Sequence, residues 1–565
     1  MRISLLFIIF ITILMGGIEN VKSFKILVSA PNYFHSHMKL HIEIADLLAE
    51  RGHQVTLLII NLNPYNNYPP KDNTKWTKSQ NVIRQSAKGK ELQILKDSFD
   101  RSPFYNSHVW AEDLVIYNEK NGLYIKELFD TACKAFFNDK ELLSSLKSQN
   151  FDLGISEWQD GCMFSMFNHL GIHATVATSA IPMDLLQARI FGIPMPLYIP
   201  EVNTATPEGT SMGIWDRVRT LYNRIENKAE RFFNMDEWCK EIFGQTFIPR
   251  DELLLRSAFF LINTNEMLDL AKPISAKIKH IGGFTLQNNQ NNHLDIQTES
   301  LLTKSIRGAI LVSFGSVADP NQMPKEMFNN LMNSFASFPE YNFILKSNDN
   351  EEKIIKNESK ILLNKNEYIL PENVYKFGWM NQRAILAHPK VRLFISHCGL
   401  NSLNEAAFEG VPLLCIPIFG DQNYNSAIVN QRKIGKVLLK NQLNEINLKK
   451  ILEELLDENN EYSQNAIIVS QKIQKAPFQP KEILLRHVEF AAQFGGNFSE
   501  LNLEGAKMSS FAYFGLDILF FLIIVGIIVF IVGFKLYGFL FTIIIKNRFF
   551  NNFIVLINFK KNKIE

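Results

Sequence analysis

Residues 394–422, FISHCGLNSLNEAAFEGVPLLCIPIFGDQ, hold a group of side chains that could bind a charged ligand. The apolar run at the start of this segment suits a buried strand and ends before Gly399, where the missing Cβ permits a sharp turn and a close ligand. Asn401 and Ser402 are frequent N-cap residues, so we expect a short helix that stops at Gly410. A helix that begins after such a turn presents unpaired N–H groups and the positive end of its dipole, and this arrangement binds a diphosphate.

Further polar groups in the same segment suit a nucleotide sugar. Glu405 lies one turn beyond the N-cap residues, where its carboxylate could accept hydrogen bonds from a ribose diol. The short pattern His-x-Gly-x-Asn-Ser alone also fits an ordinary strand-to-helix turn of an α/β protein, because short glycine motifs are weak evidence. Chance is a poorer explanation of the whole segment, since Pro412, Pro417 and the pair Asp421-Gln422 complete it.

Two histidines near the N-terminus could act as a general base. His35 and His37 lie between an apolar strand predicted at 24–30 and an amphipathic helix predicted at 39–52, and another strand is predicted at 55–61. This order is typical of a Rossmann-like domain, in which an active site is expected at the C-terminal end of the first strand. A lone loop histidine is otherwise more often a solvated or structural residue.

A carboxylate could support such a base. Residues 151–157, FDLGISE, are predicted as a strand that ends at Glu157, and Asp160 follows closely. Either carboxylate could hold an imidazole in one tautomer and stabilise its protonated form. Either could also be a solvated acid at a strand end.

Chain length and composition limit the number of domains and the classes of partner that this chain can have. With 565 residues the chain is too long for one hydrophobic core, so two domains are expected. The charge is balanced, with 59 Lys and Arg against 57 Asp and Glu, and this gives no case for a nucleic-acid partner. The cysteines show no metal-ligand spacing, and although one bridge could form, no disulfide framework is implied. They are Cys133, Cys162, Cys239, Cys398 and Cys415.

Both ends of the chain carry apolar stretches. Residues 1–23 are typical of a secretory signal peptide, with an N-terminal anchor as the alternative. Residues 514–534 are long enough to cross a bilayer, and a basic tail at 535–565 ends in KNKIE, the form of a dilysine-type retrieval signal. These features predict a single-pass type I protein of the endoplasmic reticulum membrane with lumenal domains. The sequons at Asn357 and Asn497 would be glycosylated there.

Residues 214–233 are predicted as an amphipathic helix, with packing against the core favoured over a position on a membrane. Its apolar side consists of Trp215, Val218, Leu221, Tyr222 and Ile225.

The segment at 394–422 resembles the signature of the UDP-glycosyltransferases, specifically the membrane-bound animal UDP-glucuronosyltransferase family. The family often has a second glycine where this chain has Cys398. The matching residues are Phe394, Ile395, Ser396, His397, Gly399, Ser402, Glu405, Pro412, Pro417, Asp421 and Gln422.

The resemblance covers nearly the whole chain and implies an α/β structure of the GT-B fold. Such a structure has two Rossmann-like domains facing a cleft, here with one C-terminal transmembrane helix. The expected boundaries are 24–284 for an N-terminal acceptor-binding domain, 285–306 for a linker and 307–495 for a C-terminal UDP-sugar-binding domain. The family's C-terminal helix, matched by residues 478–494, crosses back to the first domain.

The resemblance also assigns the catalytic pair. The family places its base in a Ser-His segment at a set distance before an Arg-Gly-His, and Ser36-His37 and Arg51-Gly52-His53 reproduce that spacing. This implies His37 as the base, in preference to His35. Glu157 stands where the family usually has an aspartate that hydrogen-bonds the base, and Asp160 is the competing candidate.

The donor contacts follow from the same resemblance. Trp379 would stack on the uracil ring, and Gln382 would hydrogen-bond the ribose or the base edge. Asn263 stands where glucuronic-acid users commonly carry an arginine, which favours a neutral sugar such as glucose. The other expected UDP-sugar contacts are Ser316, His397, Gly399, Asn401, Ser402, Glu405, Asp421 and Gln422, the last two for sugar hydroxyls.

The implied reaction is an inverting transfer from UDP-glucuronic acid or UDP-glucose to a hydroxyl of a small lipophilic acceptor. No Asp-x-Asp occurs in the sequence, which agrees with helix-dipole stabilisation of the leaving group, so neither a metal nor a cofactor is expected. Two alternatives stay open. One is a non-catalytic UDP-sugar or lipophile-binding protein of the same fold, and the other is a dedicated lipid or sterol glycosyltransferase. The acceptor and the oligomeric state cannot be inferred from these patterns.

Overall fold

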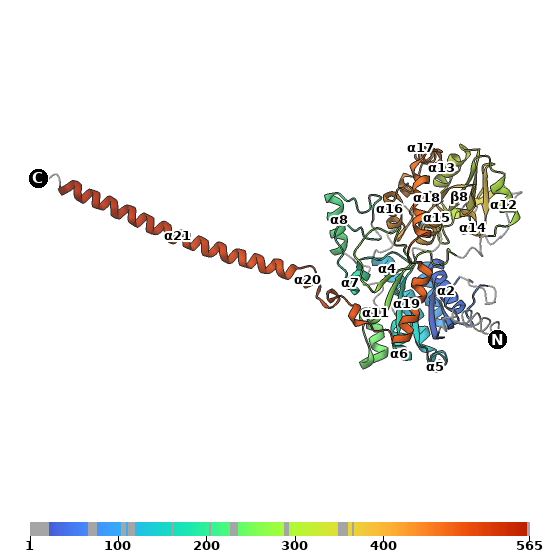
Figure 1. Cartoon of the computed structure of the whole chain (residues 1–565), viewed down its shortest axis with the longest axis horizontal. Helices are drawn as coiled ribbons and strands as arrows, with labels where there is room; N and C mark the ends of the chain where they lie inside the picture. Colours follow the sequence, from blue (N-terminus) through green and yellow to red (C-terminus); the bar gives the residue numbers. More distant parts are fainter. Residues whose placement is uncertain are drawn as a thin grey trace, which may run out of the picture. The chain divides into compact units, whose positions relative to one another are not determined.

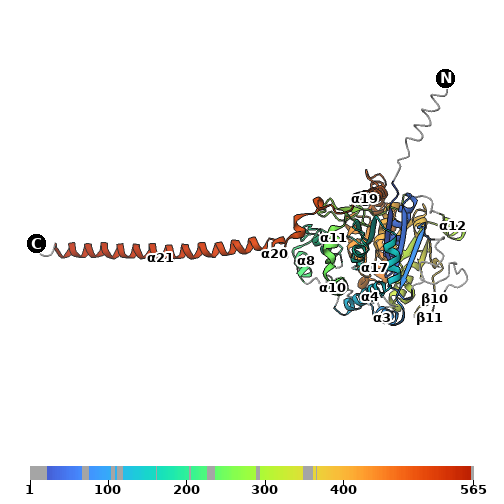
Figure 2. The same ribbon diagram turned by 90° about the horizontal axis from the view of Figure 1, so that it is seen from below.

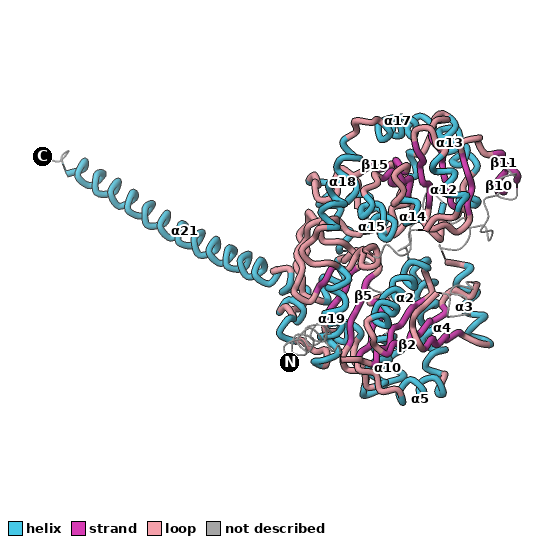
Figure 3. Tube along the Cα trace, turned by 45° about the vertical axis from the view of Figure 1, so that its right-hand side comes forward, coloured by secondary structure: helices cyan, strands magenta, loops and turns pink. Residues whose placement is uncertain are grey.

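The computed structural model describes residues 22–65, 76–102, 109–110, 119–160, 162–202, 205–225, 236–287, 293–347, 360–363 and 366–561. The chain divides into two compact units, residues 1–502 and 503–565. The first unit contains two parallel sheets, each flanked by helices (Figure 3). Almost all of the predicted signal peptide, residues 1–23, and the predicted sequon residue Asn357 lie outside the described residues.

A seven-stranded parallel sheet forms the centre of the first domain, in the order β3-β2-β1-β4-β5-β6-β7. Alternate residues of β1 belong to different clusters, Leu27 to one and Ile26 and Val28 to the other, so apolar side chains cover both faces of the sheet. The strands are β1 (Lys25–Pro31), β2 (Gln54–Asn61), β3 (Asn81–Ser86), β4 (Leu153–Glu157), β5 (Thr175–Ser179), β6 (Phe259–Ile262) and β7 (Ile278–His280).

The helices of the first domain place the predicted histidines differently from the sequence interpretation. Helix α2 begins at His35, so His35 and His37 lie in its first turn and not in a loop. Phe34 occupies the N-cap without a side-chain cap, so no capping residue marks this start in the sequence. The helices are α2 (His35–Glu50), α3 (Gly89–Asp100), α4 (Glu119–Asn138), α5 (Lys140–Ser148), α6 (Met163–Leu170), α7 (Leu185–Ile190), α8 (Ile214–Ile225), α10 (Asp236–Phe243) and α11 (Arg250–Arg256).

A six-stranded parallel sheet forms the centre of the second domain, in the order β12-β9-β8-β13-β14-β15. Its strands are β8 (Gly308–Ser313), β9 (Tyr341–Lys346), β12 (Val374–Phe377), β13 (Val391–Ser396), β14 (Leu413–Cys415) and β15 (Gly435–Val437). A separate antiparallel pair consists of β10 (Lys360–Leu363) and β11 (Asn366–Ile369).

The helices of the second domain include one inside the predicted linker. Helix α12 lies within residues 285–306, and its Leu301 and Leu302 pack into a core cluster of the second domain. Much of the predicted linker is therefore part of this domain. The helices are α12 (Ile296–Thr303), α13 (Lys325–Ala336), α14 (Gln382–Leu386), α15 (Leu400–Glu409), α16 (Gln422–Gln431), α17 (Glu445–Leu456) and α18 (Glu461–Gln474).

Helix α19 (Pro480–Phe494) packs against the first sheet, among the helices of the first domain (Figure 1). Leu484 and Val488 are fully buried in a cluster with β1 and α2, and Glu489 accepts a hydrogen bond from Arg51 at 3.0 Å. The predicted crossing of the C-terminal helix is present, and the range 307–495 thus includes a helix that packs with the other domain.

The second unit consists mainly of α21 (Leu516–Lys561), one continuous helix after the short α20 (Ser510–Tyr513) (Figure 2). Residues 516–557 are long and apolar enough to cross a membrane. Nearly all of the predicted span at 514–534 and most of the predicted tail at 535–565 form one continuous helix. The apolar residues of 536–557 continue the helix, with charges only at Lys546 and Arg548 in that part. At about 1.5 Å per residue this helix exceeds the roughly 30 Å apolar core of a bilayer.

Two disulfides are present, whereas the sequence implied no disulfide framework and left one bridge possible. Cys133 of α4 joins Cys162, which precedes α6, and Cys398 joins Cys415 of β14. Cys239 is a buried free thiol.

Candidate active site

A cleft of about 630 Å³ lies between the two domains of the first unit. Both domains supply its walls, the first through the start of α2 and the second through the ends of several strands. The predicted residues in its lining are His37, Ser316, Trp379, Gln382, His397, Gly399, Asn401, Ser402, Glu405, Asp421 and Gln422. Glu157 and Asn263 are not part of the lining.

The predicted strand, turn and helix form one side of the cleft. Strand β13 ends at Ser396, α15 begins at Leu400 with Gly399 as its N-cap, and Gly410 ends it in the left-handed conformation at φ 75°. The prediction that Asn401 and Ser402 cap this helix is wrong, because the helix starts earlier and both residues lie in its first turn. The start of α15 nevertheless lines the cleft, as a diphosphate site requires.

Cys398 occupies the position where a second glycine was expected. Its φ of 59° lies in the left-handed region, which costs a non-glycine residue about 1 kcal/mol or more. The residue is fully buried, and its disulfide to Cys415 ties this turn to the neighbouring strand β14. The backbone conformation explains why glycine suits this position.

His397 lies between two glycines that leave room for its ring. A Cβ on Gly315 would come within 2.7 Å of its Nε2 atom, and one on Gly399 within 2.5 Å. Burial, together with the charge of Lys346, lowers the pKa of His397 to about 4. The imidazole is therefore neutral near pH 7 and can offer an N–H group to an anion without carrying a charge.

Lys346 adds a cation to the donor side of the cleft. Its Nζ atom donates a hydrogen bond to the carbonyl oxygen of Gly315 at 2.9 Å and lies 4.7 Å from the ring centroid of Trp379. Burial lowers the pKa of Lys346 to about 8. Lys346 is the last residue of β9, one residue after the strand predicted at 342–345. Ligands of such folds bind at the C-terminal ends of the strands, so a basic residue at this position was the signal that could have identified it.

Trp379 presents its ring to the cleft and also meets the first domain. It is 61% exposed, enough to leave a face for a planar base, and it contacts the ring of His35 edge-on at 4.9 Å. His35 therefore belongs to the wall beside the proposed uracil site. Burial is the main cause that lowers the pKa of His35 to about 4, which leaves it neutral at pH 7.

Gln382, Ser402 and Glu405 are connected by hydrogen bonds. The Nε2 group of Gln382 donates to Glu405 Oε2 at 2.7 Å and to Ser402 Oγ at 3.2 Å. Lys39 of α2 reaches Glu405 at 3.9 Å from across the cleft. This group places a carboxylate and an amide on one wall, where they can bind the diol of a ribose.

Asp421 and Gln422 lie at the start of α16. Gln422 Oε1 accepts hydrogen bonds from the backbone N–H groups of Ile418 and Phe419 at 2.7 and 3.0 Å, which fixes the amide. Asp421 accepts a hydrogen bond from Asn425 at 2.8 Å, and burial raises the pKa of its carboxyl. Both side chains line the cleft and can accept or donate hydrogen bonds to sugar hydroxyls. Ser316 follows Gly315 in the lining, as predicted.

His37 is held by two groups of the first domain. Its Nδ1 atom lies 3.4 Å from Glu157 Oε2 and 2.8 Å from the Tyr33 hydroxyl. Tyr33 donates its own proton to Gln159 Oε1 at 3.0 Å, so its oxygen must accept from His37 Nδ1–H. This chain places the proton on Nδ1 and leaves Nε2 as the basic atom. Tyr33 and Gln159 were missed by sequence reasoning, because no motif marks them.

Glu157 is fully buried at the end of β4, and the backbone N–H of Ala180 donates to its two oxygens at 3.1 and 3.3 Å. Strands β1 and β4 are neighbours in the sheet, so their C-terminal ends bring His37 and Glu157 together. The predicted pair is thus in contact.

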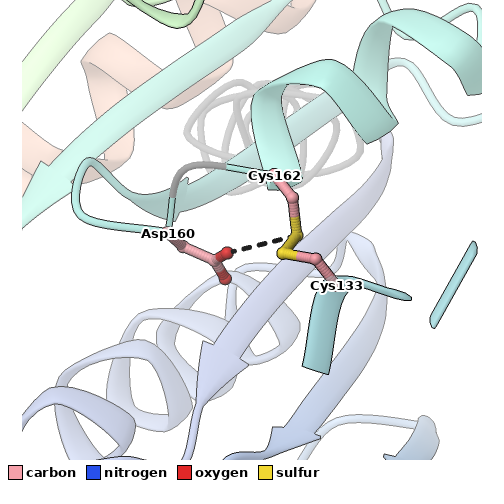
Figure 4. Close-up of side chains that lie close together, drawn as sticks. All are labelled: Cys133, Asp160 and Cys162. Atoms are coloured by element: carbon pink, nitrogen blue, oxygen red, sulfur yellow. Dashed lines mark hydrogen bonds between the residues drawn. A yellow bond between two sulfur atoms is a disulfide. The ribbon is translucent and has the colours of Figure 1, made fainter. Parts of the chain in front are cut away.

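Asp160, the competing carboxylate, faces a different group (Figure 4). It is buried, and its Oδ1 atom lies 3.8 Å from Cys162 Sγ. Burial, and then the charge of Glu157, raise the pKa of Asp160 to about 7. Cys133, Asp160 and Cys162 are close enough to suggest metal ligands, but the two sulfurs are bridged and so are not thiolates. The bridge instead holds the turn that carries Gln159.

Asn263 is 3% exposed and links the two domains. Its Nδ2 group donates to Asn401 Oδ1 at 2.7 Å, and its carbonyl oxygen accepts from Asn404 at 2.9 Å. Any influence of Asn263 on the donor sugar would therefore act through Asn401, which does line the cleft. The sequon residue Asn497 is exposed.

The comparisons with known proteins agree with this geometry. The family described as UDP-glucoronosyl and UDP-glucosyl transferase matches residues 24–549. The chain belongs to this family. It is a UDP-sugar-dependent glycosyltransferase, and its two parallel sheets with the cleft between them are the GT-B fold.

Relatives of this glycosyltransferase match over most of their length. Human "UDP-glucuronosyltransferase 3A2" is 28% identical over 82% of this chain and 83% of that protein. The Caenorhabditis elegans protein named "Putative UDP-glucuronosyltransferase ugt-47" is 27% identical over 88% of this chain and 89% of its own.

Solved structures share the fold. Os79 from O. sativa in complex with U2F and trichothecene has a TM-score of 0.55 at 19% identity, covering 83% of this chain and 99% of its own. Phytolacca americana UGT2 complexed with UDP-2fluoro-glucose and pterostilbene has a TM-score of 0.53 at 16% identity, covering 83% of this chain and 100% of its own.

Proposed function

We propose that this glycosyltransferase transfers a neutral hexose from its UDP-sugar to a hydroxyl of a small lipophilic acceptor, with inversion and with His37 as the base. The observation that carries the proposal is the position of His37. Its Nδ1 atom is held by Glu157 and Tyr33, while the residue lines a cleft whose opposite wall suits a nucleotide diphosphate.

The reaction is a single displacement. His37 Nε2 takes the proton of the acceptor hydroxyl, and the oxygen attacks the anomeric carbon as the bond to the UDP oxygen breaks. The imidazolium that forms is stabilised by Glu157, 3.4 Å away. UDP leaves with the electron pair of the broken bond, and the configuration at the anomeric carbon inverts.

The donor wall suits a diphosphate leaving group without a bound metal. The start of α15, neutral His397 and the cation Lys346 all line the cleft, and together they can stabilise the negative charge that develops on the diphosphate. Hydrogen-bond donors fixed before the reaction are the kind of stabilisation that needs no metal ion. We therefore expect activity to survive a chelator of divalent metals.

The choice of a neutral sugar is supported by charge. Family members that use glucuronic acid commonly carry an arginine, which could pair with the sugar carboxylate, where this chain has Asn263. The Asn263 side chain is instead hydrogen-bonded to Asn401. Asp421 adds a carboxyl group to the lining of the cleft. In its ionised form this group would repel the carboxylate of a glucuronic acid bound nearby. A hexose with hydroxyl groups alone avoids this repulsion.

We also propose that α21 anchors the enzyme in the endoplasmic reticulum membrane with its catalytic unit in the lumen. The length and apolar composition of this helix support the anchor. Exposed Asn497 gives the test, because only a lumenal site is glycosylated. A glycosidase should reduce the apparent mass of the chain, and Asn497→Gln should remove part of that shift. A mass that glycosidase does not change would contradict the lumenal orientation.

Donor-resolved turnover tests the enzymatic proposal. Membranes from cells expressing the full chain receive a simple phenol with either UDP-glucose or UDP-glucuronic acid. We expect glucoside, and His37→Ala should reduce the rate by about 10³-fold while UDP still binds. His293→Ala, at an exposed histidine, is the matched control and should keep full activity. Glucuronide instead would overturn the donor choice and keep the mechanism. Full activity in His37→Ala would overturn the mechanism.

A further inference from the structure

The apolar side of α8 points away from the protein, against the sequence prediction of a core-packing helix. Side chains that a globular core would bury are exposed from Ile214 to Tyr222 (Figure 1 shows α8 at the edge of the first unit). The exposed fractions are 64% for Ile214, 79% for Trp215, 49% for Val218, 45% for Leu221 and 57% for Tyr222.

The polar side of the same helix attaches it to the first domain. Thr220 is buried, and Arg224 pairs with Glu201 at 2.6 Å. Arg224 also donates hydrogen bonds to the carbonyl oxygens of Pro196 and Ile199 at 3.1 and 3.0 Å. Both charged side chains are largely buried, at 6% and 14% exposure, so the pair fixes the rotation of α8. The outward direction of the apolar side is therefore built into the fold.

Neighbouring residues enlarge this surface. The loop whose carbonyl groups bind Arg224 also exposes Leu197 and Tyr198, at 37% and 47%. At about 100° per residue, Arg217 and Arg219 fall on the two edges of the apolar side of α8, and both are exposed. We call the exposed side chains of α8 together with Leu197 and Tyr198 the α8 face.

The chemistry of the α8 face fits a lipid surface. Apolar side chains in the centre, aromatic rings among them and arginines on both edges are the pattern of a helix that lies in the plane of a bilayer interface. Arg217 can reach a lipid phosphate while the apolar side chains enter the boundary of the acyl chains, and Arg219 on the other edge is paired with Asp216 at 2.5 Å. A soluble helix with the same composition would bury this side.

The chain also keeps a bilayer within reach. Only residues 503–515 separate the end of the first unit from the start of α21, and an extended chain of that length spans at most roughly 45 Å. A membrane anchored by α21 is therefore always available to the first unit at high effective concentration. We propose that the α8 face lies in the interface of the membrane that α21 anchors. This inference rests on the anchor proposed above.

The test uses the full chain in phosphatidylcholine vesicles that contain phosphatidylserine. Val218→Cys is labelled with an environment-sensitive fluorophore, and lipids carrying a nitroxide at acyl carbon 5 or 12 serve as quenchers. We expect loss of fluorescence with the shallow nitroxide, less loss with the deep one, and protection from aqueous iodide. Ile446→Cys on α17, 80% exposed, is the matched control and should be quenched by iodide only.

A label at Val529→Cys in α21 separates the two proposals. If that label is quenched by the deep nitroxide while the Val218 label behaves like the Ile446 control, the anchor stands and the α8 proposal is overturned. If no lipid quenches either label, the anchor fails and the inference fails with it. A Val218 label shielded from iodide without lipid quenching would mean that a protein surface covers α8, which also overturns the proposal.

Discussion

The two walls of the cleft are constructed in different ways. Most of the donor wall, namely His397, Gly399, Asn401, Ser402 and Glu405, comes from one strand, turn and helix of consecutive residues, to which β9 adds Lys346. The catalytic wall, made by Tyr33, His37, Glu157 and Gln159, joins two segments more than a hundred residues apart. Local sequence thus specifies the first wall, whereas the pairing of β1 with β4 assembles the second.

This difference separates binding from chemistry. In the proposed reaction the donor wall binds the diphosphate before and during the transfer, so its residues should affect donor affinity and rate together. In the same proposal the catalytic wall acts on a proton that moves only during the reaction, so its residues should affect kcat with little change in UDP affinity. Substitutions on the two walls can show whether the division holds.

The largest effect among these substitutions is expected from Glu157→Gln. Glutamine keeps the size of the side chain but cannot stabilise the imidazolium of His37 as a carboxylate does. We expect kcat to fall by at least about a hundredfold, with the affinity for UDP unchanged. Calorimetric titration with UDP and initial rates on the same preparation measure both. A loss of UDP affinity as large as the loss of kcat would contradict the proposed division between a binding wall and a catalytic wall.

The two walls also differ in how far the sequence could predict them. The apolar run before Gly399, together with Gly399 and Gly410, was sufficient for the strand-turn-helix, although the helix starts before the expected caps at Asn401 and Ser402. His37 and Glu157 could be paired only through a family resemblance. The supporting contacts of Tyr33 and Gln159 depend on side-chain positions across a loop, and no local pattern encodes them.

Helix α8 shows a further limit of periodic patterns. Its spacing identified an apolar side, but only the buried pair of Arg224 and Glu201 decides that this side faces outward. For Asn263, the sequence suggested contact with the donor, whereas tertiary packing buries it against Asn401. In both cases the residue type was read correctly, and the partner was decided by distant parts of the chain.

On the donor wall, Lys346 should make donor use depend on pH. Its pKa is lowered to about 8, so the side chain is a cation below that pH and loses its charge as the pH rises through it. We expect kcat/KM for the UDP-sugar to fall by about tenfold between pH 7 and 9.5, the worth of a hydrogen bond to a charged group. Lys346→Arg keeps the charge over this range and should flatten the profile. A decline of the same size in the arginine variant would assign the titration to another group.

The smallest effect is expected from Tyr33→Phe, which tests whether Tyr33 contributes to the catalytic wall by positioning His37. The substitution removes the hydroxyl that accepts from His37 Nδ1 at 2.8 Å but leaves Glu157 in place. One neutral hydrogen bond is worth about 1 kcal/mol, so kcat should fall by about fivefold at constant KM for the donor. Gln159→Leu should have a similar effect, and the double variant should lose little more, because both act through one chain of hydrogen bonds. Fully additive losses would show that Tyr33 and Gln159 act independently, and Tyr33 would then not position His37 through Gln159.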